Sequence, residues 1–470
     1  MKICLIAEGC YPYLVGGVSS WIQSLITSLP EYRFVIYAIG ANQESRGDFK
    51  YKLPSNVVEV KEVFLDAVLE EDGKWGKRYK LRKSENDAIE SLLEGRETDW
   101  QYVFDFFLRD SRKNAADFLT SKNFLDMVKK TYHHKYSKLS FTDFFWTMRS
   151  IYLPLFYLIK QGIEEADLYH SVSTGYAGIV GSLGSYLYDK PYVVTEHGIY
   201  TREREEEIIQ ADWVKGYFKD IWIEYFYSLS RCAYHYADEV ITLFSTNKEI
   251  QVELGCSADK IRIVPNGVKV EGFTEIAQKD EADEHINIGA VVRIVPIKDI
   301  KSMLQSFDLV KKQVPNTRLY IMGPTDENEE YYEECKLLLK ILGTEDVIFT
   351  GRVDIKEYIG KMDVLVLSSI SEGQPFAILE GMACGKPFVA TNVGSCKELI
   401  YGENDDYGKA GIIVPLMNDE KMGNAIVKLC RSEALRAEMG QAALRRVKEL
   451  YAKDDFIATY RDLYHSYEGV

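Results

Sequence analysis

Short apolar runs alternate with amphipathic segments along most of this chain of 470 residues. The runs at residues 2–7, 286–292 and 364–367 have the length and the continuous apolar character of strands that are buried on both faces. Residues 18–29 and 302–312 instead repeat their apolar side chains every three or four positions, which is the spacing of an amphipathic helix. The alternation of the two patterns predicts an α/β protein built on parallel sheets.

The same alternation continues through both halves of the chain. Further strands are predicted at residues 33–39, 167–172, 190–195, 238–243, 261–264, 318–322, 347–349, 387–390 and 411–414. Further helical sequence is predicted at residues 333–342, 419–450 and 454–467. We therefore expect each half to form a doubly wound, Rossmann-like sheet.

The length of the chain predicts two domains, because a single hydrophobic core rarely serves more than about 300 residues. The sequence Pro265-Asn266-Gly267-Val268, followed by polar residues to about residue 283, is typical of a hinge between domains. We therefore expect an N-terminal domain at residues 1–272 and a C-terminal domain at residues 273–452.

Residues 60–165 break the alternation and read as a mostly helical insertion in the first domain. The segment is rich in charged residues and in the aromatic residues Trp75, Trp100, Phe104, Phe106, Phe107, Phe144, Phe145 and Trp146. These side chains predict ordinary packing in a core and on a surface. The alternative is a docking face for partner proteins or for an acceptor chain, because aromatic residues are enriched at interfaces.

The formal net charge of -15 excludes one class of partner. Sequence-independent binding to nucleic acids needs a basic surface, and here 72 acidic residues outnumber 57 basic ones. We therefore expect no nucleic-acid partner, although an acidic chain can still carry a local basic site for an anion.

Three further features predict a cytoplasmic protein. The eight cysteines are scattered without a C-x-x-C or a metal-binding spacing, which favours reduced thiols. The first residues run directly into strand-like sequence without a targeting pattern, and no apolar run approaches the roughly 20 residues of a membrane span. Contact with the inner face of the plasma membrane is expected only through protein partners.

A glycine pair closes the loop after the first strand. Residues 8–17 read E-G-C-Y-P-Y-L-V-G-G and end on Gly16 and Gly17, directly before the first amphipathic helix. Strand, glycine loop and helix are typical of a nucleotide-binding fold, but the G-x-G-x-x-G of dinucleotide-binding enzymes is absent, which argues against hydride transfer. For the pair alone, an ordinary turn before a helix is the alternative.

His197 follows another predicted strand, within T-E-H-G-I-Y-T-R-E-R-E-E-E-I at residues 195–208. Open α/β sheets bind ligands just beyond the carboxyl ends of their strands, so this histidine is a candidate site residue. A structural role is the alternative for an isolated histidine.

Two cations follow the first strand of the second domain, where Arg293 and Lys298 lie five residues apart in R-I-V-P-I-K-D-I. Arginine can bind two phosphate oxygens at once and lysine adds a point charge, so the pair predicts an anion clamp. A solvated surface pair is the alternative. No D-x-D loop follows a strand, so we expect no metal ion to hold a diphosphate.

The most informative segment is S-E-G-Q-P-F-A-I-L-E-G-M-A-C-G-K-P at residues 371–387. It follows a predicted buried strand, and it places Glu372 in a loop and Glu380 about one turn into a helix that starts near Phe376. The backbone N–H groups at a helix start suit a polyhydroxylated or anionic ligand such as a sugar nucleotide. A strand-to-helix turn with two solvated glutamates is the alternative.

This segment resembles the E-x7-E signature of the retaining GT-B glycosyltransferases of family 4, in its spacing, its loop composition and the following A-x-G-x-P-F-V-A pattern. The resemblance implies two Rossmann-like domains that face each other across a cleft. It also implies a UDP-sugar donor, no cofactor or metal ion, retention of the anomeric configuration, and a last helix, at about 453–470, that packs back on the first domain.

The resemblance further implies roles for single residues. Glu380 would bind the ribose hydroxyls, and Glu372 would contact the donor sugar and help to organise the transition state. His197 would lie near the transferred sugar, and Arg293 and Lys298 would stabilise the departing diphosphate. Other donor contacts would come from Gly16, Gly17, Gly351, Arg352, Val353, Gly373, Gln374, Pro375 and Phe376.

A closer resemblance covers almost the whole chain and is to the glycosyltransferases of Pel exopolysaccharide synthesis. It rests on residues 8–22, residues 195–208 and the aromatic insertion between them. It implies a polysaccharide acceptor, a hexosamine-containing biofilm polymer and an inner-membrane Pel synthase complex as partner. The alternatives are another GT-B enzyme, such as a UDP-sugar 2-epimerase or a disaccharide synthase, and a non-catalytic scaffold that docks through the insertion.

Overall fold

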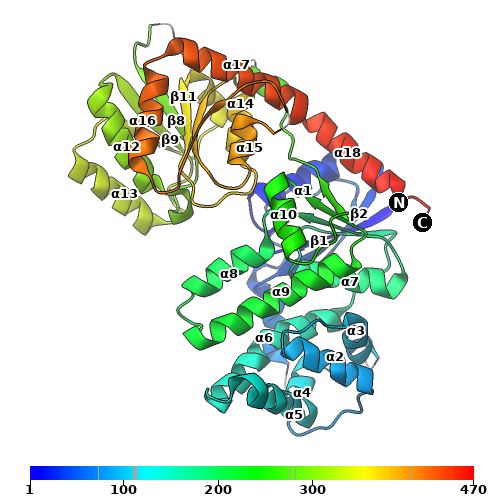
Figure 1. Cartoon of the computed structure of the whole chain (residues 1–470). Coiled ribbons are helices and arrows are strands. Elements are labelled where there is room, and N and C mark those ends of the chain that lie inside the picture. The colour runs from blue at the N-terminus through cyan, green and yellow to red at the C-terminus, as the bar shows by residue number, and fades with distance from the viewer. Residues whose placement is uncertain (72, 110–113, 275, 281, 404, 470) are drawn as a thin grey trace. The chain divides into compact units, whose positions relative to one another are not determined.

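The computed structural model describes residues 1–71, 73–109, 114–274, 276–280, 282–403 and 405–469. It divides into two compact units, one of Met1–Ile263 with Arg461–Val470 and one of Val264–Tyr460 (Figure 1). The chain therefore passes between the units one residue before the predicted hinge sequence. Residues 72 and 110–113 of the predicted insertion, and residue 470 of the predicted last helix, lie outside the described residues.

The first unit contains a seven-stranded parallel sheet with the order β3-β2-β1-β4-β5-β6-β7. Its strands are β1 (Lys2–Glu8), β2 (Arg33–Gly40), β3 (Val57–Phe64), β4 (Leu168–Ser171), β5 (Tyr192–Glu196), β6 (Glu239–Thr242) and β7 (Ile261–Ile263). The strand order turns back between β1 and β4, so the loops after these strands diverge there and leave room for a ligand.

Strand β3 moves the start of the predicted insertion. The sequence pattern predicts an insertion from about residue 60, but Val57–Phe64 pair in parallel with β2. Residues 57–62 of this edge strand are exposed or partly exposed, whereas Val63 and Phe64 at its end are buried. The strand lacks the continuous apolar run of a central strand, so the insertion begins after Phe64.

The insertion is mostly helical, as predicted. It contains α2 (Lys83–Leu93), α3 (Trp100–Leu108), α4 (Ala115–Leu119), α5 (Lys122–Thr131) and α6 (Phe141–Gln161), with short turns at η2 (Leu65–Glu70) and η3 (Tyr132–Tyr136). Six of the eight aromatic residues predicted to pack are buried in the core of the first unit, while Trp75 is 62% and Trp146 46% exposed. Packing in the core thus accounts for most of the aromatic residues of the insertion, but it does not account for Trp75 and Trp146.

The sheet of the first unit is covered by the remaining helices (Figure 1). They are α1 (Gly17–Ser28), α7 (Tyr176–Tyr188), α8 (Tyr200–Gln210), α9 (Lys219–Tyr236) and α10 (Ser245–Glu253), with short turns at η1 (Gln43–Ser45) and η4 (Gly216–Phe218). None of the described helices in either unit is long and apolar enough to cross a membrane.

The second unit contains a six-stranded parallel sheet with the order β10-β9-β8-β11-β12-β13. Its strands are β8 (Ile286–Val291), β9 (Thr317–Met322), β10 (Val347–Gly351), β11 (Val364–Leu367), β12 (Phe388–Thr391) and β13 (Gly411–Val414). All six were predicted within two residues of their observed ends. The strand order turns back between β8 and β11.

Helices cover both faces of this second sheet (Figure 1). They are α11 (Glu271–Thr274), α12 (Ile300–Gln313), α13 (Glu329–Leu342), α14 (Phe376–Ala383), α15 (Cys396–Tyr401), α16 (Asp419–Cys430) and α17 (Glu433–Leu450), with turns at η5 (Pro296–Lys298), η6 (Ile355–Glu357) and η7 (Ile359–Lys361). The helical sequence predicted at 419–450 is two helices, because the Ser432 side chain accepts the Leu435 N–H and starts a new one.

The last helix, α18 (Lys453–Ser466), contributes residues to both units, and from Arg461 onward it belongs to the first. Arg461 forms an ion pair with Glu31 at 2.7 Å. The Tyr464 hydroxyl lies 2.6 Å from Nδ1 of the buried His170 on β4. These contacts fix the end of the chain on the first unit.

Candidate functional site

Lys298 and Glu372 form an ion pair where the strand order of the second sheet turns back. Lys298 ends the turn after β8 and Glu372 lies in the loop after β11, which is the neighbour of β8. The Lys298 Nζ lies 2.5 Å from Glu372 Oε1, and the two side chains are only 16% and 11% exposed. Partial burial weakens solvent screening, so both charges act more strongly on a ligand here than they would on an open surface.

Buried hydroxyl groups hold the two loops together. Ser369 donates from Oγ to Glu372 Oε1 at 2.5 Å, and Ser368 donates to the Lys298 carbonyl at 2.7 Å. Thr391, at the end of β12, donates to the Ser369 carbonyl at 2.6 Å. Sequence analysis missed these three residues, although each lies at the carboxyl end of a buried strand, where site residues are expected.

Gly394 allows the loop after β12 to approach the loop that carries Glu372. Its φ is +48°, and a Cβ at this position would lie 2.2 Å from the Glu372 carbonyl oxygen and 2.3 Å from that of Gly373. The N–H of the next residue, Ser395, donates to the Gly373 carbonyl at 3.0 Å. Glycine is required here both by the backbone angle and by the lack of space.

Replacing Gly394 with alanine should therefore lower the free energy of unfolding of the second unit by more than about 2 kcal/mol, because strain and a steric clash add together. Gly343→Ala is the matched control, since φ is +67° there but an added Cβ meets no described atom within 4 Å. The control should cost about 1 kcal/mol from strain alone. Urea denaturation measures both, and equal losses would contradict the role of close approach at Gly394.

Glu380 lies on α14, the helix that begins directly after the Glu372 loop. Burial raises the pKa of Glu380 to about 7, although the positive charge of Lys356 opposes part of this rise. Pro375 precedes the helix, and no side-chain hydrogen bond caps the helix start in the described residues. The first N–H groups of α14 are therefore open to an anionic or hydroxylated ligand.

Gln374 ties the Glu372 loop to the segment that enters the second unit. Its Oε1 accepts the backbone N–H of Asn266 at 2.6 Å, and both side chains are buried. The predicted hinge residues therefore contact the predicted donor loop within the same unit.

Arg293 and Gly351 lie in loops after other strands of the second sheet. The Arg293 guanidinium is 57% exposed and pairs with Glu327 at 2.9 Å, so the two predicted cations contact different carboxylates. Gly351 ends the edge strand β10 with a φ of +69°, and its carbonyl accepts the Gly323 N–H at 3.1 Å. Arg352, which follows it, is exposed.

The glycine pair and His197 lie at the carboxyl ends of strands in the first unit. Gly16 precedes α1 and Gly17 is its first residue, and an added Cβ at either meets no described atom within 4 Å. His197 follows β5 and packs edge-on against Trp21 of α1, with ring centroids 4.6 Å apart. Burial lowers the pKa of His197 to about 4, so the ring is neutral at pH 7. Its buried Nε2 has no hydrogen-bond partner among the described residues.

A buried carboxylate directly precedes this histidine and was missed by sequence analysis. Glu196 accepts the Tyr200 N–H at 3.0 Å, the Tyr234 hydroxyl at 2.7 Å and Gln251 Nε2 at 2.8 Å. Burial raises the pKa of Glu196, and these donors oppose the rise. The network fixes the end of β5 and therefore the position of His197.

Two family models match this chain. Residues 1–259 match the model described as a domain of unknown function, DUF3492, and residues 285–432 match the model described as group 1 glycosyl transferases. The chain belongs to the DUF3492 family. The second unit of this DUF3492 protein is a group 1 glycosyltransferase domain, and it contains Lys298, Glu372 and Glu380.

Curated relatives and solved structures agree with this assignment. An Escherichia coli UDP-Gal:alpha-D-GlcNAc-diphosphoundecaprenol alpha-1,3-galactosyltransferase is 26% identical over 333 residues, which is 65% of the DUF3492 protein and 79% of the relative. The Staphylococcus aureus capsular polysaccharide biosynthesis glycosyltransferase CapM is 23% identical over 336 residues, 67% of this chain and 83% of the relative. HepE of Anabaena in complex with UDP superposes with a TM-score of 0.62 at 14% identity, over 99% of this chain and 100% of that one. The predicted GT-B fold is thereby confirmed.

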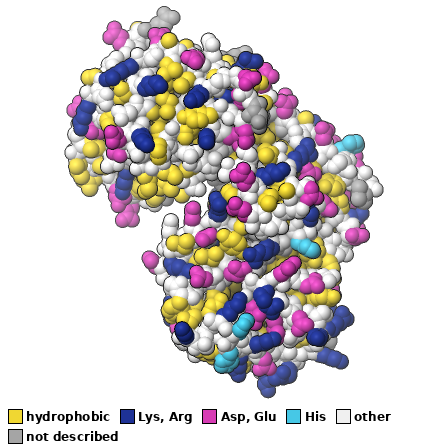
Figure 2. Space-filling model, in the orientation of Figure 1, with side chains coloured by type: hydrophobic (Ala, Val, Ile, Leu, Met, Phe, Trp, Pro, Cys, Tyr) yellow, Lys and Arg dark blue, Asp and Glu magenta, His cyan; other side chains and the backbone are white. Residues whose placement is uncertain are grey.

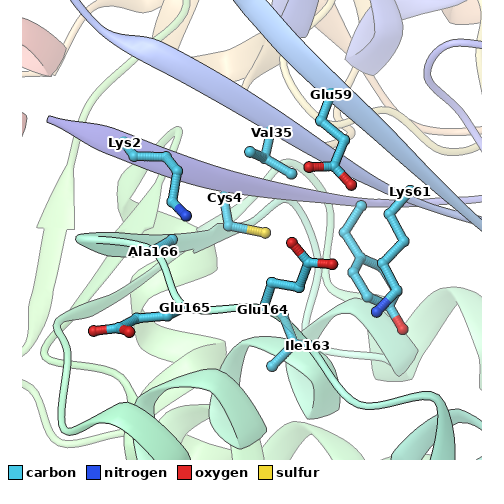
Figure 3. Close-up of a pocket in the computed structure, with 10 residues that line it drawn as sticks. Lys2, Cys4, Val35, Glu59, Lys61, Ile163, Glu164, Glu165 and Ala166 are labelled. Atoms are coloured by element: carbon cyan, nitrogen blue, oxygen red, sulfur yellow. The ribbon is translucent and has the colours of Figure 1, made fainter.

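The first unit also contains a small pocket, which is separate from the candidate site residues. It is lined by the strand residues Lys2, Cys4, Val35, Tyr37, Glu59 and Lys61 and by residues 163–166 (Figure 3). Its volume is about 10 Å³, which holds one water molecule at most. None of the predicted site residues lies in its described lining, so it adds nothing to the candidate site.

Proposed function

We propose that the protein is a retaining glycosyltransferase that moves a sugar from a UDP-sugar to a growing polysaccharide without a metal ion. The observation that carries this proposal is the mostly buried Lys298–Glu372 pair at the point where the strand order of the second sheet turns back, beside the open start of α14. A positive charge and a helix start at one sheet edge suit a nucleoside diphosphate sugar. The activities named for the galactosyltransferase and CapM support the same class of reaction.

In the proposed reaction, the bond between the anomeric carbon and the phosphate oxygen breaks, and the acceptor hydroxyl forms the new bond on the same face of the sugar. The negative charge that develops on the leaving diphosphate is stabilised by Lys298 and by the dipole of α14. The leaving phosphate oxygen takes the proton of the acceptor hydroxyl. Glu372 holds the Lys298 ammonium in place and orients the donor sugar.

The finer part of the proposal is that this protein is a Pel polysaccharide glycosyltransferase of the PelF type. The motifs at residues 8–22 and 195–208 support it, because both lie at the carboxyl ends of strands in the first unit, where an acceptor would be recognised. The expected partner is an inner-membrane Pel synthase complex. Product analysis after incubation with UDP-sugars tests this point, since an epimer or a disaccharide in place of a lengthening chain would overturn it.

Calorimetric titration with UDP, GDP and ADP in buffer containing EDTA tests the donor and the metal independence together. We expect UDP to bind in EDTA, with GDP and ADP at least about tenfold weaker, a difference of about 1.4 kcal/mol. Binding that requires added Mg²⁺, or equal affinity for the three nucleotides, would overturn the proposal.

UDP binding should strengthen as the pH rises from 6 to 8. Burial raises the pKa of Glu380 to about 7, so its carboxyl is mostly protonated at pH 6 and mostly ionised at pH 8. Ribose hydroxyls donate better to the ionised form, so the Kd should fall about tenfold across this range. Titration of Glu380→Gln over the same range is the control, because it retains only the ionisation of the UDP phosphate. A pH profile unchanged by this variant would contradict the assignment.

The same carboxyl should oppose folding when UDP is absent. The pKa of Glu380 is raised by burial from 4.5 to about 7, so the stability of the second unit falls as the pH rises through this window. At pH 8 the Glu380→Gln variant should therefore be more stable than the wild type by about 2 kcal/mol while it binds UDP more weakly. A substitution that raises the stability of the fold and lowers the affinity for the ligand is typical of a buried carboxylate that binds a ligand.

A further inference from the structure

A groove in the first unit is lined by three tryptophan side chains, of which only Trp222 packs against the core. Trp146 lies on α6, Trp213 in the connection between α8 and α9, and Trp222 on α9. The groove has a volume of about 270 Å³. In Figure 2, hydrophobic side chains are exposed over the part of the first unit that carries α8 and α9.

The indole rings of this groove are unusually accessible for tryptophan. Trp213 is 70% and Trp146 46% exposed, although large aromatic side chains are highly buried on average. Trp213 stands edge-on to Trp222 with ring centroids 5.4 Å apart, and Trp75 lies 6.0 Å from Trp146. The Arg149 guanidinium lies over the Trp146 ring, 5.7 Å from its centroid, so the most open indole surface in the groove is that of Trp213.

Polar groups lie between the rings, and their charges cancel. Asp143 and Lys215 form an ion pair at 2.7 Å that joins α6 to the connection after α8. Thr147 and Ser150 add hydroxyl groups, and they lie one and two turns after Asp143 on the same face of α6. The described lining therefore offers aromatic faces, hydroxyl groups and a carboxylate with no net charge, and the Arg149 guanidinium lies outside this lining, over the Trp146 ring.

We propose that this groove binds an uncharged oligosaccharide stretch of the acceptor chain, an inference that rests on the proposed function. The C–H groups on one face of a sugar ring pack against the negative face of an indole ring. The hydroxyl groups at the ring edge bond to polar side chains such as those of Asp143 and Thr147. An aromatic pocket with a few convergent polar groups is the usual design of a site for a small polar ligand.

The charges nearby argue against two other occupants. A nucleotide or another anion finds one ammonium in the described lining, and Asp143 neutralises it. An anionic membrane surface would be repelled by the acidic sequence T-R-E-R-E-E-E of α8, which precedes the connection that carries Trp213. If the occupant is a protein, neither hexamer should bind.

Binding of the acceptor chain in the groove, away from the reacting end, should affect the length of the polymer. A chain that stays bound in the groove after one transfer is present for the next, at a high effective concentration. Loss of the groove should therefore shorten the polymer while the slow hydrolysis of the donor continues unchanged.

The test is calorimetric titration of the full chain, without donor, using β-1,4-linked hexamers of glucose and of N-acetylglucosamine. We expect at least one hexamer to bind, and we expect Trp213→Ala and Trp146→Ala each to weaken binding about tenfold. Trp213→Phe, which keeps an aromatic face, should restore most of the affinity. Leu337→Ala is the control, because Leu337 is a 58% exposed apolar residue of α13 in the second unit and lies outside the groove's described lining.

Binding by neither hexamer, or wild-type affinity in both alanine variants, would overturn the proposal. Retention of the variants' melting temperature shows that any loss is not unfolding. A UDP titration on the same samples separates this inference from the proposed function. If UDP fails to bind but a hexamer binds through Trp213, the proposed UDP-sugar donor is wrong and the oligosaccharide site is supported. If UDP binds but neither hexamer binds, only the oligosaccharide site is wrong.

Discussion

Replacing Lys298 with alanine should lower kcat for sugar transfer by about 10²–10³-fold, which corresponds to roughly 3–4 kcal/mol of lost transition-state stabilisation. One further negative charge develops on the diphosphate as it departs, so the loss should be larger in kcat than in donor affinity. The side chain is 16% exposed and its partner Glu372 11%, so water replaces the lost charge poorly. Initial rates of UDP release with a UDP-sugar donor measure the effect.

Lys301→Ala is the control for this variant. Lys301 lies three residues further along the chain, and its pair with Glu334 at 2.8 Å is 42% and 49% exposed, so its removal should change the rate less than about twofold. The double variant Lys298→Ala, Glu372→Gln should be far less than additive, because the two groups act as a unit. A Lys298→Ala enzyme with more than a third of the wild-type rate would contradict the assigned role. Unchanged polymer output in cells that carry Lys298→Ala or the double variant would favour the alternative of a non-catalytic scaffold.

The strands and the two key carboxylates could be predicted because their signals are local. A strand buried on both faces is a continuous apolar run, and β11 and the start of α14 are observed where the pattern places them. The edge strand β3 was not predicted, because both of its faces are exposed or partly exposed over residues 57–62. The contact between Lys298 and Glu372 joins residues 74 positions apart, and it follows only from the neighbouring positions of β8 and β11.

Residue type also fails to distinguish buried from exposed aromatic side chains. Phe144, Phe145 and Trp146 are consecutive on α6, and successive residues of a helix point about 100° apart, so the three cannot all face one core. The structure buries the two phenylalanines and exposes the tryptophan. Trp213 follows a strongly charged segment and carries no periodic signal at all. The sequence pattern therefore does not predict the groove, although it includes Trp146 among the aromatic residues of the insertion.

Arg446 presents the largest expected effect on stability. This α17 side chain is fully buried, and it donates to both carboxylate oxygens of Asp405 at 2.8 Å. It also donates to the backbone carbonyls of Leu399 at 3.3 Å, Ile400 at 3.1 Å and Gly408 at 2.6 Å. Hydrogen bonding to Arg446 lowers the pKa of Asp405, so the stabilisation is complete near neutral pH and is lost as the pH falls below about 4. One guanidinium therefore joins α17 to the end of α15 and the loop that follows it.

Arg446→Met should lower the free energy of unfolding of the second unit by about 3–5 kcal/mol at pH 7, because it removes the buried counter-charge of Asp405 and the guanidinium donors to three carbonyl groups. Arg445→Met is the neighbouring control; this exposed guanidinium lies 4.4 Å from the Tyr407 ring and should contribute about 1 kcal/mol or less. Urea denaturation at pH 7 compares the two, and similar losses would contradict the role of the buried network. Because α15 begins two residues after Gly394, loosening it should also displace the Glu372 loop, so Arg446→Met should weaken UDP binding where Arg445→Met does not.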